Sequence, residues 1–193
     1  MNFFDPIDDM ENEDSMFPLS HTYSNRLNDM GVLEYLDDIV DGRVLDLGCS
    51  YGFTTEELDR RYPSEIIGLD AYRREDQKDK NPDIIVGLAP NTPFKSESFD
   101  TVVAANSIGV VGQDFIMGDN KAREFRSEVL NDIREILTPG GHFVIINDGS
   151  FDQVEYLELQ KNEDDWDINR MPEGSDRRME EWINETQIDE PYI

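Results

Sequence analysis

The segment Arg43-Val44-Leu45-Asp46-Leu47-Gly48-Cys49-Ser50-Tyr51-Gly52 decides the fold of this chain. It begins as a short apolar strand with an acidic residue near its end, and it continues as a turn of small residues before a helical pattern. Gly48 and Gly52 are able to adopt a positive φ and place no Cβ in the turn. The free N–H groups of the following helix then point at whatever lies there. This arrangement is typical of a site for a nucleotide-like ligand.

Apolar runs alternate with helical patterns from this segment to residue 146. Uninterrupted apolar runs predict buried strands at residues 44–47, 66–69, 84–86, 101–105 and 142–146. Buried strands separated by helices form parallel sheets whose two faces are both covered. The pattern therefore predicts an α/β domain with a doubly wound, mostly parallel sheet and helices on both faces.

Helical spacing occurs before and between these strands. Residues 32–40 predict a short amphipathic helix, residues 54–62 a helix whose threonines cap its N-terminus, and polar residues 73–82 a short helix. The strongest pattern covers residues 121–137 and has one apolar face. It ends at Thr138-Pro139-Gly140-Gly141, because proline and glycine both terminate helices.

The two ends of the chain carry weaker patterns than its middle. Residues 1–22 are acidic and are expected to form a flexible segment, and residues 23–150 to form the main domain. Residues 151–193 are expected to complete that domain or to pack on it as an acidic extension. Within the extension, apolar residues in 154–168 fit either a helix or terminal edge strands, and residues 178–183 have helical spacing.

The chain is strongly acidic along its whole length. Its 193 residues suit one domain, and 17 Lys and Arg against 44 Asp and Glu give a net charge of −27. Carboxylates at this density repel one another in dilute buffer, but at molar salt the Debye length is about 3 Å and the repulsion is screened. The composition favours a halophilic, cytoplasmic protein, for example from a haloarchaeon, over the alternative of an ordinary acidic protein.

Composition also bears on partners and location. The net charge and the lack of a basic patch disfavour nucleic acid, since phosphate binding depends on Lys and Arg. No run of 18 apolar residues and no signal-peptide pattern is found, which predicts a protein that is neither exported nor bound to a membrane. Cys49 is the only cysteine, which excludes an intramolecular disulfide, and we expect it to pack rather than to react. No group of residues has the spacing of a metal site.

Residues suited to ligand binding follow the predicted strands. In an open parallel sheet, ligands bind beyond the carboxyl ends of the strands, where the strand order reverses. Asp70 stands 24 positions after Asp46, close to the spacing expected for an acidic residue that accepts both hydroxyls of a ribose. The residues at these ends are Asp46 with Gly48, Asp70, Leu88 with Ala89, Asn106, and Asp148.

Four segments in register resemble the class I S-adenosylmethionine-dependent methyltransferases, in particular a group of small methyltransferase domains that act on metabolites. The resemblance covers residues 30–148 and implies a Rossmann-like domain that binds S-adenosylmethionine. Residues 44–52 resemble the glycine-rich first motif of the family, and residues 67–70 its ribose-binding strand end. Residues 93–94 with 98–103 resemble the approach to its fourth strand, and residues 137–142 the turn before its fifth.

By this resemblance, the methionine end of the cofactor lies at the first motif. Asp46 would orient it, and the turn from Gly48 to Gly52 would pass beneath it. Asn106 would lie near the methionine portion and the methyl acceptor. Ser50 stands where the family motif has its middle glycine, a position at which many members of the family tolerate a small residue.

The resemblance places the nucleoside end of the cofactor at the second and third strands. Asp70 would bind the ribose hydroxyls, and Leu88 and Ala89 would flank the adenine. Leu88 replaces an acidic residue that the family often has near the adenine. Adenine recognition would then rely on backbone groups and apolar contact.

The catalytic residues stay unassigned. The Glu-His pair that the family often has after the fourth strand is replaced by Ser107-Ile108-Gly109. Methyl transfer depends mainly on proximity and alignment, and it needs a base only when the nucleophile is protonated. His21, Tyr23 and Asp148 are candidate bases by position alone.

The sequence thus predicts a methyltransferase that acts on an unidentified small molecule, and it leaves two alternatives open. A non-catalytic relative would keep the cofactor-binding fold as a regulatory or scaffold module. A nicotinamide-dependent oxidoreductase would use a similar strand, turn and helix. Dinucleotide-binding folds favour a Gly-x-Gly-x-x-Gly turn, however, and here the acidic residue Asp46 precedes the first glycine.

Overall fold

The computed structural model describes residues 32–72, 83–105, 107, 119–148, 154–163 and 165–170. Some of the predictions lie outside these residues. They are the N-terminal segment 1–22, the helices expected at 73–82 and 178–183, and the candidate site residues His21, Tyr23 and Asn106.

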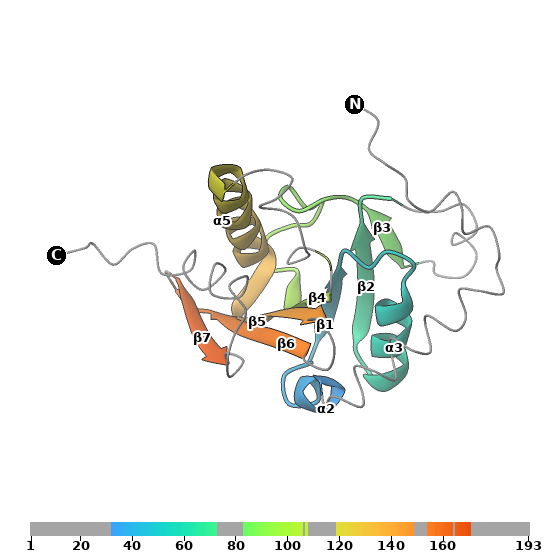
Figure 1. Cartoon of the computed structure of the whole chain (residues 1–193). Helices are drawn as coiled ribbons and strands as arrows, with labels where there is room; N and C mark the ends of the chain where they lie inside the picture. Colours follow the sequence, from blue (N-terminus) through green and yellow to red (C-terminus); the bar gives the residue numbers. More distant parts are fainter. Residues whose placement is uncertain are drawn as a thin grey trace.

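The described strands form one sheet. They are β1 (Arg43–Leu47), β2 (Glu65–Asp70), β3 (Ile84–Val86), β4 (Phe99–Ala105), β5 (Leu137–Asp148), β6 (Val154–Lys161) and β7 (Trp166–Arg170). Their order is β3-β2-β1-β4-β5-β6-β7 (Figure 1). β1 pairs in parallel with both β2 and β4. The chain therefore adds β2 and β3 on one side of β1 and then returns to add β4 and the later strands on the other side. This confirms the predicted doubly wound, mostly parallel sheet.

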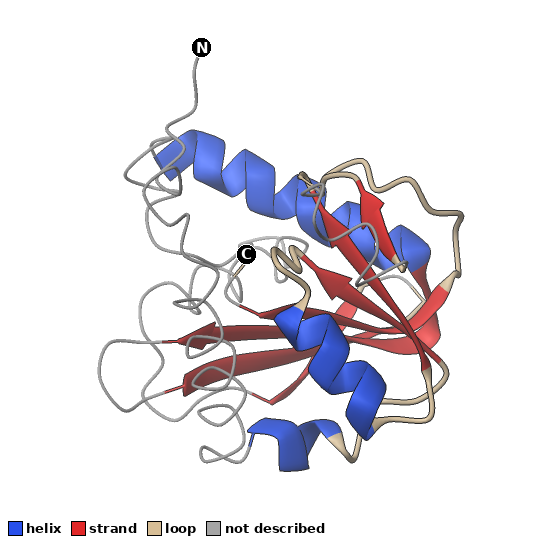
Figure 2. Cartoon of the chain, turned by 90° about the vertical axis from the view of Figure 1, so that its right-hand side faces the viewer, coloured by secondary structure: helices blue, strands red, loops and turns tan. Residues whose placement is uncertain are grey.

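Helices cover both faces of the sheet, as predicted. The described helices are α2 (Val32–Leu36), α3 (Phe53–Arg61) and α5 (Asp119–Ile136). α5 packs on one face through residues such as Val129 and Ile133, and α2 and α3 pack on the other face through Leu36 and Leu58 (Figure 2). β1 lies between the two layers and is buried from both sides, which explains its uninterrupted apolar run.

Most boundaries lie within a few residues of the predicted ones, and two differ. α2 ends at Leu36 and continues as a turn, with the amide of Ile39 bonded to the carbonyl of Leu36 at 3.1 Å, so this helix is shorter than predicted. After α5, the strand begins at Leu137 rather than His142, because Leu137 already pairs with Phe99 of β4. The helix itself stops before Thr138, as the proline and glycines predict.

The N-terminus of α3 corrects one prediction. No threonine caps this helix: Gly52 is the N-cap residue, with a φ of 78°, and no side chain bonds to the cap. Thr55 lies inside the first turn and faces the sheet, where its hydroxyl donates a hydrogen bond of 2.7 Å to Oδ2 of Asp46. Thr55 therefore provides a hydrogen-bond donor to a buried carboxyl group, and Gly52 adopts the left-handed conformation at the start of the helix.

Residues 154–161 and 166–170 form strands at one side of the sheet rather than a helix, and β7 is the edge strand. β6 pairs antiparallel with β5, and β7 pairs antiparallel with β6. Glu158 of β6 is buried on the face that α2 covers, and its carboxylate accepts hydrogen bonds from the Tyr35 hydroxyl and from Asn169 and lies 2.7 Å from Nδ1 of His142. Burial raises the pKa of Glu158, but these hydrogen bonds outweigh burial and hold the pKa below its usual value. This polar cluster links α2 to the last three strands.

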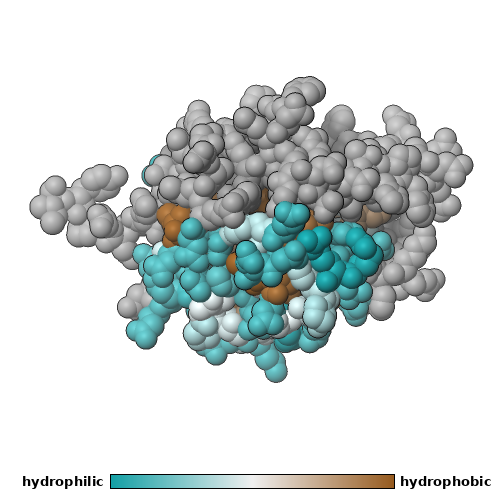
Figure 3. All heavy atoms as spheres, turned by 90° about the horizontal axis from the view of Figure 1, so that it is seen from below, coloured by the Kyte–Doolittle hydropathy of each residue, from teal (hydrophilic) through white to brown (hydrophobic). Residues whose placement is uncertain are grey.

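The surface of the described part is mainly hydrophilic when seen from below (Figure 3). A few large apolar side chains are exposed instead, and they gather near the ends of β2 and β3. They are Tyr72, Ile85, Val86 and Leu88. None of the described helices is long and apolar enough to span a bilayer.

Candidate functional site

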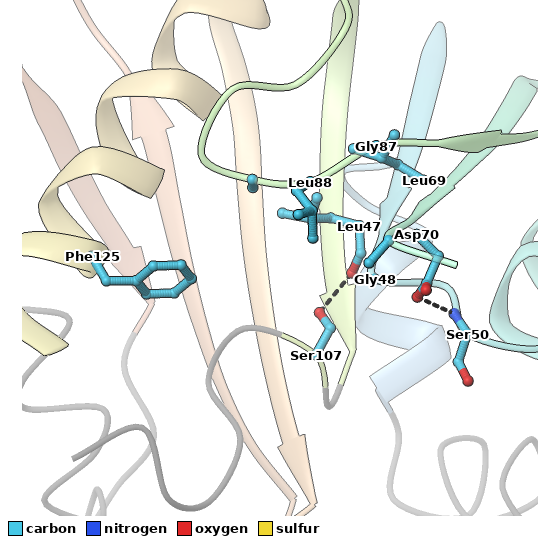
Figure 4. A pocket seen from close by; sticks show the side chains of 11 residues that line it. Leu47, Gly48, Ser50, Leu69, Asp70, Gly87, Leu88, Ser107 and Phe125 are labelled. Atoms are coloured by element: carbon cyan, nitrogen blue, oxygen red, sulfur yellow. Dashed lines mark hydrogen bonds between the residues drawn. The ribbon is translucent and has the colours of Figure 1, made fainter. Parts of the chain in front are cut away.

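A pocket of about 370 Å³ opens at the carboxyl ends of the central strands (Figure 4). It lies at the point where the strand order reverses, between β1 with β2 on one side and β4 on the other. This is the place expected for a ligand in an open parallel sheet. Five of the predicted site residues line it: Gly48, Ser50, Asp70, Leu88 and Ala89. Two other predicted residues, Asp46 and Gly52, are described but do not line it.

The turn after β1 is shaped by its backbone conformation. Gly48, Ser50 and Gly52 all have positive φ values, of 73°, 48° and 78°. The amides of Gly48 and Cys49 both bond to the carbonyl of Leu69, at 2.7 and 3.1 Å, which draws the turn towards the end of β2. A Cβ on Gly48 would stand 2.3 Å from the Cβ of Ser107. Glycine is therefore needed at position 48 for both conformation and space.

Asp70 ends β2, and two backbone amides hold its carboxylate. Oδ2 accepts a hydrogen bond of 2.8 Å from the amide of Ser50, and Oδ1 accepts one of 3.0 Å from the amide of Tyr72. The first of these bonds connects the carboxylate to the glycine turn (Figure 4). Because a carboxylate has about four acceptor sites, each oxygen retains capacity for a ligand hydroxyl.

Asp46 lies beneath the turn rather than in the pocket. Its side chain is 1% exposed and accepts the hydrogen bond from Thr55. Burial raises the pKa of Asp46 to about 7; the Thr55 hydrogen bond opposes this shift, and the negative charge of Asp70 adds to it. The carboxyl group therefore gains or loses its proton near neutral pH. That Asp46 orients the methionine end of a cofactor stays a prediction.

Cys49 packs within the same turn. Burial raises the pKa of its thiol to about 12, so the thiol stays protonated and is a poor nucleophile at neutral pH. A Cβ on Gly68 of β2 would stand 2.8 Å from Sγ of Cys49. The thiol thus fills the space that this glycine leaves, in agreement with a packing role.

Ser107 and Phe125 also line the pocket, and the sequence motifs did not predict either of them there. Ser107 follows β4, and its hydroxyl donates a hydrogen bond of 2.6 Å to the carbonyl of Leu47, at the end of β1 (Figure 4). Phe125 belongs to α5 and projects into the pocket from the side opposite Asp70 (Figure 4). In the sequence, Phe125 is one member of the apolar helix face, and no local signal separates it from the residues that pack on the sheet.

Replacing Ser107 with alanine tests the bond between β4 and β1. We expect the free energy of unfolding to fall by about 0.5–1.5 kcal/mol, the usual net value of one hydrogen bond, because the alanine Cβ still packs against Gly48. Chemical denaturation of the two proteins measures the difference. Serine to threonine at the same position is the matched comparison, since it keeps the hydroxyl. Equal stability of the alanine variant and the parent protein would contradict a role for this bond.

The chemistry of the pocket suits a nucleotide-like ligand. One side offers a fixed carboxylate and a glycine turn, and the other offers the apolar side chains of Leu88 and Phe125. Asp148, a candidate base, ends β5. Within the described part of the chain, no group of three or more His, Cys, Asp or Glu residues is placed to hold a metal ion.

The sheet order defines a Rossmann-like α/β protein, and the pocket lies at its switch point, where ligands bind in open parallel sheets. A family model described as a methyltransferase domain matches residues 45–145, more than half of the chain. The chain belongs to this family, within the class I S-adenosylmethionine-dependent methyltransferases, as the sequence motifs predict. The cofactor of that class is S-adenosylmethionine.

A curated relative and two solved structures show how far the similarity extends. Dimethylglycine N-methyltransferase from Parasynechococcus marenigrum is 29% identical over 123 residues, covering 62% of this chain and 42% of that enzyme. The chain therefore spans less than half the length of this relative. The PH0226 protein from Pyrococcus horikoshii OT3 has a TM-score of 0.56 at 20% identity, over 94% of this chain and 86% of that one. An S-adenosylmethionine-dependent methyltransferase from Methanosarcina mazei has a TM-score of 0.48 at 18% identity, over 58% and 56% of the two chains.

Proposed function

We propose that this chain is an S-adenosylmethionine-dependent methyltransferase that acts on a small molecule. The observation that carries the proposal is the carboxylate of Asp70, held by two backbone amides at the pocket beside the glycine turn. Such a carboxylate is suited to accept the two hydroxyls of a ribose. Membership of the methyltransferase-domain family supports the same cofactor.

In this proposal the cofactor lies across the carboxyl ends of the strands. Its ribose is bound by Asp70, and its adenine packs against Leu88, which is 61% exposed and so available to a ligand, and against Ala89. Its methionine end extends over Gly48 towards Ser107, above the buried carboxyl group of Asp46. Exposed apolar side chains in a pocket are a common site for an aromatic ring.

We further propose that the acceptor is an amine. S-adenosylmethionine supplies an electrophilic methyl group on a sulfonium. Among the described residues that line the pocket, Asp70 is the only ionisable side chain, so they offer no separate base. An amine that has released its ammonium proton to solvent has a lone pair to form the new N–C bond while the C–S bond breaks towards sulfur. A primary or secondary product then also releases its extra proton to solvent, so the transfer itself needs no base in the pocket. The name of the curated relative, dimethylglycine N-methyltransferase, points to the same class of nucleophile.

The same lack of a base among the described lining residues also fits a second candidate function. A non-catalytic module would bind the cofactor through Asp70 and the glycine turn and would transfer no methyl group. The two functions share the binding site and differ in the reaction.

The first experiment is calorimetric titration with S-adenosylhomocysteine in molar KCl, with NADH as the control. High salt is chosen because the net charge of −27 suits a protein adapted to screened conditions. We expect micromolar affinity for S-adenosylhomocysteine and no binding of NADH. A folded protein that does not bind S-adenosylhomocysteine would refute the proposal.

A second assay separates the enzyme from the binding module. Protein with labelled S-adenosylmethionine is offered a panel of small primary, secondary and tertiary amines, with matched alcohols as the control. Label transferred to an amine supports the enzyme. Tight cofactor binding without transfer to any amine or alcohol supports the non-catalytic module.

A further inference from the structure

The loop over residues 87–98 carries one wall of the pocket and is anchored at both ends. At its start, the amide of Gly87 bonds to the carbonyl of Asp70 at 2.9 Å. At its end, the amides of Glu97 and Ser98 bond to the last carbonyls of α5, at 3.0 and 2.7 Å. Leu88 and Ala89, which line the pocket, lie between these anchors.

A third anchor holds the middle of this loop, and a single side chain of α5 provides it. The amide of Thr92 donates to the carboxylate of Asp132 at 3.0 and 3.3 Å, and the Thr92 hydroxyl donates to Oδ1 at 3.2 Å. Both residues are half-buried. Hydrogen bonds to a carboxylate are stronger than neutral ones, so this contact fixes the loop more firmly than an ordinary turn would.

The geometry of the loop transmits this contact to the pocket wall. Thr92 is only three residues beyond Ala89. Between them, Asn91 adopts a φ of 80°, a left-handed conformation that persists in a non-glycine residue only where its surroundings hold it. The loop also folds back on itself, because a Cβ on Gly87 would stand 2.9 Å from Cδ of Pro93. Thr92 is joined to Leu88 through residues 89–91 on one side, and its neighbour Pro93 contacts Gly87 on the other. A shift of Thr92 therefore moves the backbone both before and after Leu88.

We propose that Asp132 is a positioning residue for the cofactor: by holding Thr92, it keeps Leu88 and Ala89 in the place where the adenine packs. Asp132 does not line the pocket and acts through the loop. The inference rests on the proposed function, because it assigns the adenine to this wall. It adds to that function a residue on the far side of the loop that determines cofactor affinity.

The test compares Asp132→Ala with a matched control, Glu135→Ala. Both substitutions remove one carboxylate from the same helix. The Glu135 carboxylate accepts a hydrogen bond of 3.0 Å from the Ser96 hydroxyl, further along the loop, and the backbone bond from Glu97 to the Glu135 carbonyl remains in the alanine variant. In calorimetry, we expect Asp132→Ala to weaken S-adenosylhomocysteine and adenosine by the same factor, about 10-fold. Methionine affinity should not change, and Glu135→Ala should behave as the parent protein.

Two milder variants keep the test decisive if Asp132→Ala does not fold. Asp132→Asn keeps the shape and one acceptor oxygen, and Thr92→Val removes only the hydroxyl bond, so both should weaken adenosine less, by about 2- to 5-fold. Unchanged adenosine affinity in the folded variants would overturn the inference while leaving the proposed function intact. Equal losses for adenosine and methionine would also overturn it, because they would indicate a general structural role. No binding of S-adenosylhomocysteine by the parent protein would instead refute the proposed function.

Discussion

Replacing Asp70 with alanine is expected to weaken the binding of S-adenosylhomocysteine about 10- to 150-fold. This range corresponds to a loss of about 1.5–3 kcal/mol in binding free energy, the usual strength of hydrogen bonds between a charged group and a hydroxyl such as those of the ribose. The substitution also removes the acceptor for the amides of Ser50 and Tyr72, so the glycine turn loses one of its supports. Isothermal titration of the parent protein and the variant measures the change.

The ribose assignment has a sharper test in the choice of ligand. The parent protein should bind adenosine more tightly than 2′-deoxyadenosine, and Asp70→Ala should lose that preference, because the deleted carboxylate no longer distinguishes the hydroxyl. Asp59→Ala is the matched control, since it removes an exposed carboxylate from α3, away from the pocket. If a folded Asp70→Ala protein still prefers adenosine, another group binds the ribose and the assignment is wrong.

Replacing Asp46 with asparagine is expected to stabilise the protein above pH 7. The pKa of this buried carboxyl group is about 7 in the folded state against an ordinary value of 3.8. Between these values the folded state keeps a proton that the unfolded state releases, so stability falls as pH rises from about 4 to about 7 and does not recover above it. Asparagine has the same shape, still accepts the Thr55 hydrogen bond, and removes the cost of a buried charge, which is on the order of a few kcal/mol.

The measurement is chemical unfolding of both proteins between pH 5 and pH 8. The difference in the free energy of unfolding should widen in favour of Asp46→Asn as pH rises, and it should level off above about pH 7. Comparing the two proteins removes the contribution of the other acidic residues, which both share. A constant difference over this range would mean that Asp46 does not titrate near pH 7. The same variant should bind S-adenosylmethionine more weakly if the buried carboxylate faces its cationic methionine end.

Local sequence patterns predicted most of the fold because they report on local backbone and burial. The apolar runs of β1, β2 and β4 are continuous since both faces of these strands are covered, and a run of this kind is visible without knowledge of its neighbours. The proline and glycines after α5 ended the helix as expected. Sequence patterns did not decide between strands and a helix for β6 and β7, because a few apolar residues among polar ones over a short length fit both strand alternation and helical spacing.

The candidate site also contains features that local sequence predicted and features that it did not. Gly48, Ser50, Asp70, Leu88 and Ala89 were predicted to lie together because each ends a strand or follows one within three residues, and parallel strands bring their carboxyl ends to one edge. The five residues do line one pocket, and their roles in binding stay predictions. The wrong prediction concerned Thr55, whose type and position suited a helix cap. Its actual partner is the carboxyl group of Asp46, and the need of a buried carboxyl group for a hydrogen-bond donor outweighed the cap.

The sequence by itself determined the alternation of strands and helices, the glycine turn after β1 and the acidic end of β2. Together these define the family and the ligand class. Only the tertiary structure decided that Ser107 and Phe125 reach the same pocket, that Asp46 is buried beneath the turn, and that Asp132 holds the loop at Thr92. The physical reason is distance along the chain. Turns and amphipathic faces arise from residues a few positions apart, whereas these contacts join segments that only the packing of α5 on the sheet and the pairing of β1 with β4 bring together.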